Sequence, residues 1–121
     1  MHPQDGNLIV KAANEWLELI DREEYDAAWS RSSTMLQEKT TQQFWVHDME
    51  KFRKEIGSLK ERSVSGLNRQ PKKGIKPYAG ILYYDAVYRN AYIPHECLYL
   101  VFENGTWKVA GYYAKLEGRT Q

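Results

Sequence analysis

The sequence has little cysteine, little net charge and no long apolar run. Its single cysteine, Cys97, excludes a disulfide within the chain and any all-cysteine metal site. No apolar run approaches the ~20 residues of a membrane-spanning helix, so we expect no membrane insertion. A net charge of +1 gives no electrostatic reason to expect nucleic acid or an anionic membrane as a partner. The fold must therefore be stabilised by packing alone.

The formal motifs of common chemistries are also missing. There is no P-loop, G-x-G-x-x-G, H-E-x-x-H, G-x-S-x-G or C-x-x-C pattern. The histidines His2, His47 and His95 do not have the spacing of a metal site. We therefore expect no metal and no cofactor, and these absences argue against an enzyme.

The length of 121 residues predicts one domain, 1–121, with an ordered core over about 8–116 and tails at 1–7 and 117–121. Residues 1–7 lack the apolar core of a signal peptide. The sequence as written therefore indicates a soluble cytoplasmic protein. Removal of an N-terminal leader would make the protein periplasmic instead.

Three helices are expected in the first half of the chain, at about 8–21, 24–32 and 41–56. Apolar residues recur there at steps of three and four, the period of a helix with one buried stripe. Thr40 and Gln43 form the pattern of a capping box before the third helix, and Gly57 suits its C-terminal cap.

Four strands are expected after Gly57, at about 59–70, 78–90, 95–103 and 106–116, with a loop over 71–77. Asn104 and Gly105 predict a type I′ turn, which places Leu98 opposite Gly111. One face of this hairpin then carries Leu98, Leu100, Phe102, Trp107, Val109 and Tyr113 toward the core. The fold class is α+β, with three N-terminal helices packed on a curved four-stranded antiparallel sheet.

Several segments in this order resemble a known bacterial family. They are AANEWLELIDREEYDAAWSRSS, the helix over 45–57 followed by SLKERSVSGLNRQ, ILYYDAVY and LYLVFENGTWKVAGYY. The family is described as domain of unknown function 4019. The resemblance implies a nuclear transport factor 2-like, or cystatin-like, fold, in which a curved sheet wraps around helices and leaves a conical pocket. It also implies export in many members, and it implies no activity and no catalytic residue.

Asp85 is the one catalytic candidate, because it interrupts an aromatic strand where a carboxylate is costly to bury. In an apolar cone it would act as a general base, with Tyr83 or Tyr113 as hydrogen-bond donor. The alternative is an exposed aspartate paired with a lysine or arginine. The residues expected to line a ligand pocket are Trp16, Trp29, Tyr83, Asp85 and Tyr113, although each tryptophan also fits a core position.

The opposite face of the last hairpin is apolar enough to predict a homodimer through the sheet. Its proposed interface consists of Tyr99, Val101, Ala110 and Tyr112. The competing explanation is a loop or tail that covers this face. Three functions remain open: a non-catalytic domain that binds an apolar or amphipathic small molecule or a partner, an isomerase, dehydratase or cyclase that uses Asp85, and a structural dimerisation module.

Overall fold

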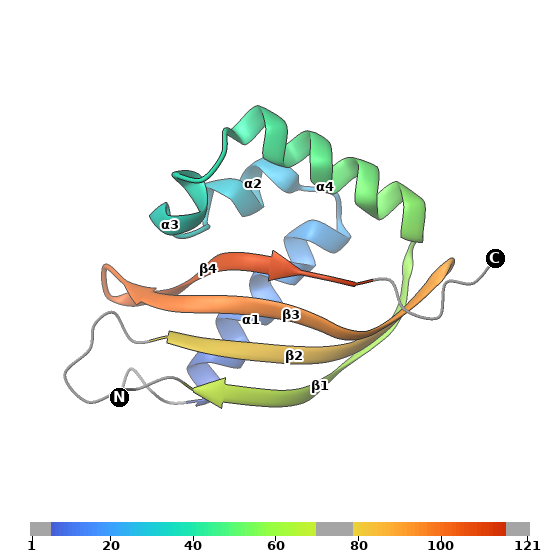
Figure 1. Cartoon of the computed structure of the whole chain (residues 1–121). Coiled ribbons are helices and arrows are strands. Elements are labelled where there is room, and N and C mark those ends of the chain that lie inside the picture. The colour runs from blue at the N-terminus through green and yellow to red at the C-terminus, as the bar shows by residue number, and fades with distance from the viewer. Residues whose placement is uncertain (1–5, 70–78, 116–121) are drawn as a thin grey trace.

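The computed structural model of the chain describes residues 6–69 and 79–115 (Figure 1). Helices come first and strands follow: α1 (Gly6–Asp21), α2 (Tyr25–Ser30), α3 (Thr34–Gln37), α4 (Gln42–Ile56), β1 (Leu59–Arg69), β2 (Ala79–Tyr88), β3 (Ala91–Glu103) and β4 (Thr106–Tyr113). Among the helices of these residues, none combines the length and apolar character needed to cross a membrane. The α+β class and the four-stranded antiparallel sheet are as the sequence predicts.

The main differences from the predicted elements are an additional short helix and an earlier start of the third strand. The short helix α3 was not expected; Ser33 caps it by accepting a hydrogen bond from the Met35 amide. Strand β3 begins at Ala91 rather than 95, because a tight turn at Arg89 and Asn90 pairs Tyr88 directly with Ala91. The predicted loop over 71–77 lies outside the described residues.

The predicted cap of α4 is wrong by one residue. Thr41, not Thr40, precedes the helix, and its hydroxyl accepts the Phe44 N–H at 3.2 Å. The other end is as expected, since Gly57 follows the helix at φ 84 and its N–H donates to the Arg53 carbonyl. Positive φ is the conformation that favours glycine at this position.

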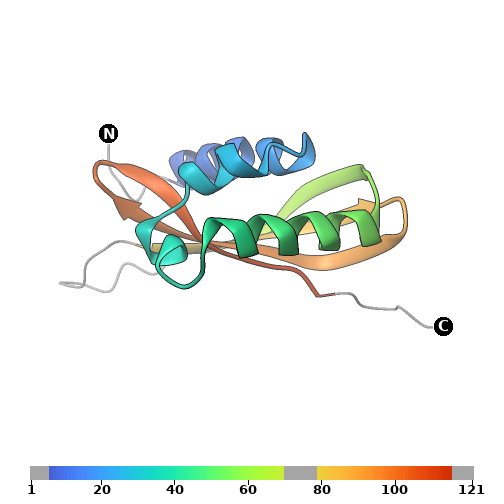
Figure 2. The ribbon, with the colours of Figure 1, turned by 90° about the horizontal axis from the view of Figure 1, so that it is seen from above.

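The sheet has the order β1-β2-β3-β4, with every neighbouring pair antiparallel. Helix α1 runs across one face of the sheet and contacts all four strands. Helix α2 packs against both α1 and α4. Figure 1 shows α4 beyond the β4 edge of the sheet, and Figure 2, which looks down on that edge, shows α1 and α2 together on one side of the strands. The sheet and the helices therefore enclose a common interior.

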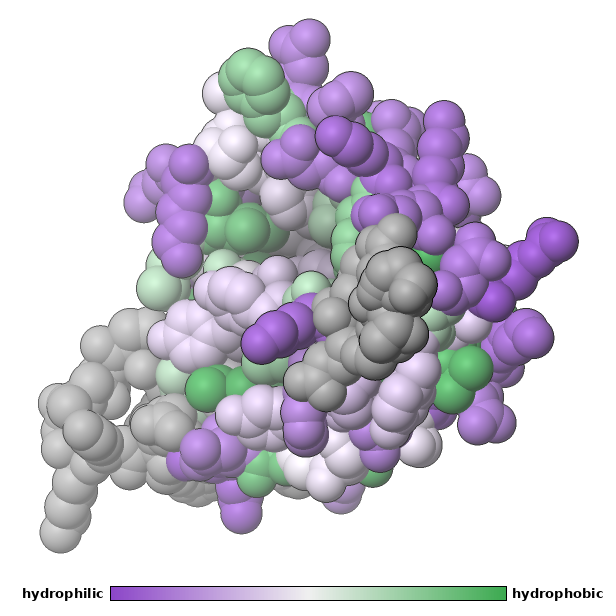
Figure 3. Space-filling model, turned by 45° about the vertical axis from the view of Figure 1, so that its right-hand side comes forward, coloured by the Kyte–Doolittle hydropathy of each residue, from purple (hydrophilic) through white to green (hydrophobic). Residues whose placement is uncertain are grey.

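Aromatic rings fill the centre of this interior. The ring of Trp45 on α4 lies 6.0 Å from that of Trp16 and 5.7 Å from that of Trp29, between centroids. The indole N–H of Trp16 donates to the Ser32 hydroxyl at 3.0 Å. Figure 3 shows hydrophilic side chains over much of the helical layer and apolar ones within the depression between helices and sheet. Burial of each such side chain contributes about 1.5–3 kcal/mol.

The register of the last hairpin differs from the prediction beyond the first pairs. Asn104 and Gly105 both have positive φ, at 54 and 82, and Leu100 pairs with Val109 as expected. Beyond that pair a bulge adds Ala110 to β4, so Leu98 pairs with Tyr112 instead of Gly111. Because side chains alternate along a strand, this shift of one residue reverses the predicted orientations of the Tyr112 and Tyr113 side chains. Tyr112 points inward, and Tyr113 points outward with 55% exposure.

Candidate ligand-binding site

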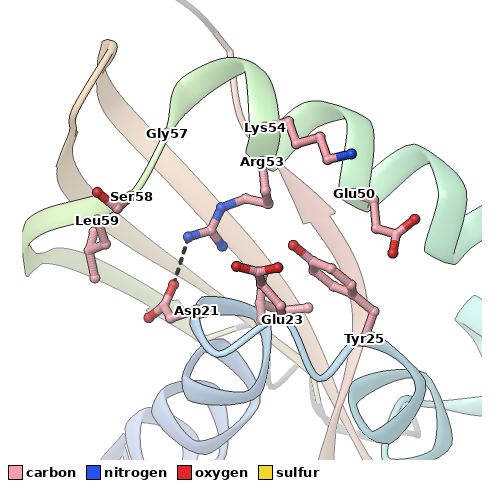
Figure 4. A pocket seen from close by; sticks show the side chains of 10 residues that line it. Asp21, Glu23, Tyr25, Glu50, Arg53, Lys54, Gly57, Ser58 and Leu59 are labelled. Carbon is pink, nitrogen blue, oxygen red and sulfur yellow. Dashed lines mark hydrogen bonds and ion pairs between the residues drawn. The ribbon is translucent and has the colours of Figure 1, made fainter.

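A pocket of about 520 Å³ lies at the end of the sheet where α4 leads into β1. The end of α1, the turn into α2, the second half of α4 and the first residues of β1 surround it (Figure 4). It is lined by Ile20, Asp21, Glu23, Tyr25, Glu50, Arg53, Lys54, Gly57, Ser58 and Leu59. Both polar and apolar atoms therefore face the same space.

Arg53 is the buried charge of this pocket. Its side chain is only 7% exposed, and Nη2 donates to Asp21 Oδ1 at 3.0 Å. Its guanidinium carbon lies 4.9 Å from the centroid of the Tyr88 ring, a cation–π contact. Its Nε and Nη1 are buried and have no hydrogen-bond partner within 6–69 and 79–115. A buried donor without a partner costs about 1–3 kcal/mol, so this arrangement requires an explanation.

A second arginine, Arg62 on β1, forms the floor beneath Arg53. It donates through Nη1 to Asp21 Oδ2 at 2.8 Å and through Nε to Glu96 Oε1 at 2.7 Å. Glu96 is 0% exposed. Burial by itself would lower the pKa of Arg62, but the hydrogen bonds and charges of Asp21 and Glu96 outweigh it and raise that pKa. The guanidinium groups of Arg53 and Arg62 thus neutralise the charges of the Asp21 and Glu96 carboxylates.

Two tyrosines complete the partners of Glu96. The hydroxyls of Tyr88 and Tyr112 both donate to Glu96 Oε2, the latter at 2.5 Å. Burial, followed by the negative charge of Glu96, raises the pKa of each tyrosine. Both therefore stay protonated donors at neutral pH. The floor is therefore a fully bonded polar network. Above it, Arg53 alone among the described residues retains buried donors without a partner.

Glu23 stands at the mouth of the pocket in a strained conformation. The turn after α1 is a Schellman motif, with the Glu24 N–H bonded to the Leu19 carbonyl at 2.8 Å and the Glu23 N–H to the Ile20 carbonyl at 3.0 Å. Glu23 occupies the left-handed position of this motif at φ 63, where glycine is usual. A side chain there costs of order 1 kcal/mol. The chain therefore tolerates strain where a carboxylate faces the pocket.

Tyr25 and Glu50 supply the remaining polar groups. Tyr25 is 5% exposed; burial raises the pKa of its hydroxyl, Arg53 opposes this, and nearby carboxylates including Glu23 and Glu50 reinforce it. Figure 4 shows Arg53, Glu23 and Tyr25 pointing into one space, whereas Lys54 lies along α4. No cluster of His, Cys, Asp and Glu in the described part of the chain has the arrangement of a metal site.

The ligand-lining residues predicted from the sequence lie in two separate places, neither of them this pocket. Trp16 and Trp29 are core residues, 3% and 9% exposed. Tyr83, Asp85 and Tyr113 lie on the face of the sheet that points away from α1, because Tyr84 and its even-numbered neighbours point inward. Asp85 therefore lies on the outer face, as in the exposed alternative given for it, and not in an apolar cone.

Asp85 instead borders a shallow depression of about 310 Å³ on the outer face, with Ser65, Gly66, Tyr83 and His95. The rings of Tyr83 and His95 meet edge to face at 6.5 Å. Within the described ranges, no hydrogen bond or ion pair joins Asp85 to His95 or to a lysine or arginine. The depression holds reactive residue types, but it has none of the bonds that would align them as a catalytic set.

The predicted dimer surface is also smaller than expected. Tyr99 is half-buried on the outer face, but Val101 and Ala110 are 1% and 0% exposed. Tyr112 faces the helices, where its ring lies 5.8 Å from that of Trp16. Of the four predicted interface residues, Tyr99 alone is both outward-facing and partly exposed, and Tyr113 lies on the same face.

The charged residues of the pocket and its floor were missed from the sequence, although a signal was present. Arg53 falls four residues after Met49 and eight after Trp45, on the buried stripe of α4. Glu96 falls two residues before Leu98, on the inward face of β3. A charge at a core position is the pattern that marks a buried ion pair or a binding site.

The geometry defines an α+β protein with an open four-stranded sheet and a polar pocket where the helices meet its first strand. The chain belongs to the family described as protein of unknown function (DUF4019), whose model matches residues 12–112. No curated protein matches the sequence. The family match covers α2, α3, α4, most of α1, the first three strands and β4 except its last residue, and it includes every residue that lines the pocket.

Proposed function

We propose that this protein is a non-catalytic binding domain that holds a small polar ligand in the pocket around Arg53. The observation that carries the proposal is the pair of unpaired donors on a guanidinium that is 7% exposed. A ligand oxygen at Nε or Nη1 would recover the hydrogen bonds that the protein leaves unmade. The pocket volume of about 520 Å³ lies within the usual range of small-molecule sites.

The proposal includes the nuclear transport factor 2-like, or cystatin-like, cone. Its support is the arrangement of α1 on a sheet whose inward side chains also meet α4 and α2. The tryptophans Trp16, Trp29 and Trp45 occupy the middle of that interior. The space for a ligand then lies at the end of the cone, above the Arg62 and Glu96 floor, rather than among the tryptophans.

An enzyme based on Asp85 has less support, because Asp85 is on the outer face and no hydrogen bond or ion pair from a lysine, arginine or histidine of the described residues aligns its carboxylate. A homodimer through that face remains a prediction that rests on Tyr99 and Tyr113. Sedimentation of the wild type at tens of micromolar, against a Tyr99→Glu, Tyr113→Glu variant, measures it. A monomeric wild type would exclude the homodimer.

The binding proposal is tested by recording amide NMR spectra while a panel of metabolite-sized acids, amines, amino acids and sugars is added. We expect a panel member to shift amides of residues 20–25 and 50–59. Tyr25→Phe, which removes only the hydroxyl, should weaken that binding, and Tyr113→Phe on the outer face should not. Shifts confined to other regions, or a panel that leaves these amides unchanged, would contradict the proposal.

A further inference from the structure

We infer that the ligand of this pocket carries a primary ammonium group next to a carbonyl or carboxylate oxygen, as a free amino acid or the N-terminus of a short peptide does. This inference rests on the proposed function and adds the chemical class of the ligand. It follows from two kinds of group in the pocket that have no partner among residues 6–69 and 79–115: the buried donors of Arg53, and the carboxylates of Glu23 and Glu50 at the mouth.

The oxygen of the ligand is specified by Arg53. The Asp21 carboxylate occupies Nη2 and the Tyr88 ring packs against the guanidinium, which leaves Nε and Nη1 as the donors without a partner among the described residues. These are hydrogen-bond donors on a cation, so their match is an oxygen acceptor, preferably one with negative charge. An apolar ligand would leave both donors unpaired, which argues against the apolar ligand expected from the sequence.

The ammonium group is specified by the carboxylates. Among the lining residues, Asp21, Glu23 and Glu50 carry negative charge and Arg53 and Lys54 carry positive charge, an excess of one negative charge. Asp21 is bonded to both Arg53 and Arg62, but no ion pair to Glu23 or Glu50 is found within residues 6–69 and 79–115. A phosphate or a dicarboxylate would meet repulsion from these two groups. A cationic nitrogen would pair with them while the adjacent oxygen reaches Arg53.

The strained backbone of Glu23 also supports a cationic group on the ligand. Glycine would fit the turn at lower cost, so the carboxylate is held in place against a local preference. The remaining lining supplies apolar contact through Ile20, Leu59 and the Tyr25 ring. A short apolar side chain beside the ammonium and carbonyl groups therefore fits the composition of the pocket.

The test is a calorimetric and NMR titration with four probes: L-leucine, tri-alanine, N-acetyl-L-leucine and isopentylamine. L-leucine and tri-alanine carry both groups, N-acetyl-L-leucine lacks the ammonium, and isopentylamine lacks the oxygen. We expect the first two to shift the pocket amides and the last two to bind at least tenfold more weakly, because each loses a charge-assisted hydrogen bond. Tighter binding of L-leucine indicates a free amino acid, and tighter binding of tri-alanine indicates a peptide N-terminus.

The matched variants are Glu23→Gln and Glu24→Gln. Both remove one exposed carboxylate from the same turn, but Glu24 does not line the pocket and pairs with Arg22 at 3.2 Å. Glu23→Gln should weaken L-leucine or tri-alanine at least tenfold, and Glu24→Gln should leave the affinity within twofold. If N-acetyl-L-leucine binds the pocket as well as L-leucine, or Glu23→Gln has no effect, the ammonium assignment is wrong while the binding function stands. If neither L-leucine nor tri-alanine shifts the pocket amides, the inference is also overturned.

Discussion

Replacement of Arg62 by methionine should destabilise the protein more than any other single change in the polar floor. Arg62 connects Asp21 on α1, Glu96 on β3 and Tyr88 on β2 through five hydrogen bonds. Methionine keeps much of the apolar stem but removes all five. Glu96, at 0% exposure, then loses its only cationic partner in the described chain.

The expected loss follows from the burial of that carboxylate. Breaking a buried ion pair on one side costs about 3–5 kcal/mol, because the remaining charge is left without compensation. Domains of this size have about 5–15 kcal/mol of unfolding free energy, so Arg62→Met removes a large part of it. The hydroxyls of Tyr88 and Tyr112 still donate to Glu96, which places the expectation near the lower end, about 3 kcal/mol.

Urea unfolding followed by circular dichroism measures this loss. Arg89→Met is the matched control, because Arg89 is exposed and its loss should change the unfolding free energy by less than about 0.5 kcal/mol. Adding Glu96→Leu to Arg62→Met should recover part of the loss, since removal of both charges leaves no unpaired carboxylate at position 96. An Arg62→Met protein within about 1 kcal/mol of the wild type would refute the role given to this network.

Three further predictions concern the turns and their caps. Gly105→Val should cost about 1 kcal/mol or more, because a β-branched residue resists φ 82, and a change of only a few tenths in urea unfolding would count against the type I′ turn. Glu23→Gly should raise the unfolding free energy by about 0.5–1 kcal/mol while weakening ligand binding; a destabilised variant would contradict the strain at φ 63. The Ser33 hydroxyl, which donates to Glu103 at 2.6 Å, lowers the pKa of Glu103 below its ordinary value of 4.5. The ionised Glu103 carboxylate therefore stabilises the fold fully above pH 4.5, and this stabilisation is lost as the pH falls through the lowered pKa. The difference in melting temperature between wild type and Glu103→Gln should shrink from pH 6 to pH 3.

The spacing of apolar residues was sufficient to predict the fold class, because most segments follow either the period of a helix or that of a strand. The stripe of Ile9, Ala13, Trp16 and Ile20 can be satisfied only by a helix against a core, and these residues are all buried. The turn at Asn104 and Gly105 fixed the first pairs of the hairpin for the same local reason. The bulge at Ala110 has no comparable local signal, because the position of an extra residue in a strand depends on the curvature of the whole sheet and on the side chains packed against it.

The site was harder to predict because it is formed by charges that balance each other across the fold. Asp21, Arg53, Arg62 and Glu96 come from α1, α4, β1 and β3, and none of these residues has a chemical partner within four positions of itself in the network. Each alone looks like an ordinary surface charge. Only the position of Arg53 on an apolar stripe, and of Glu96 on an inward strand face, separates them from surface residues. Charged residues that coincide with the buried phase of a helix or strand are therefore the better guide to a site in such a chain, whereas Asp85, which interrupts an aromatic run, lies on the outward phase of β2.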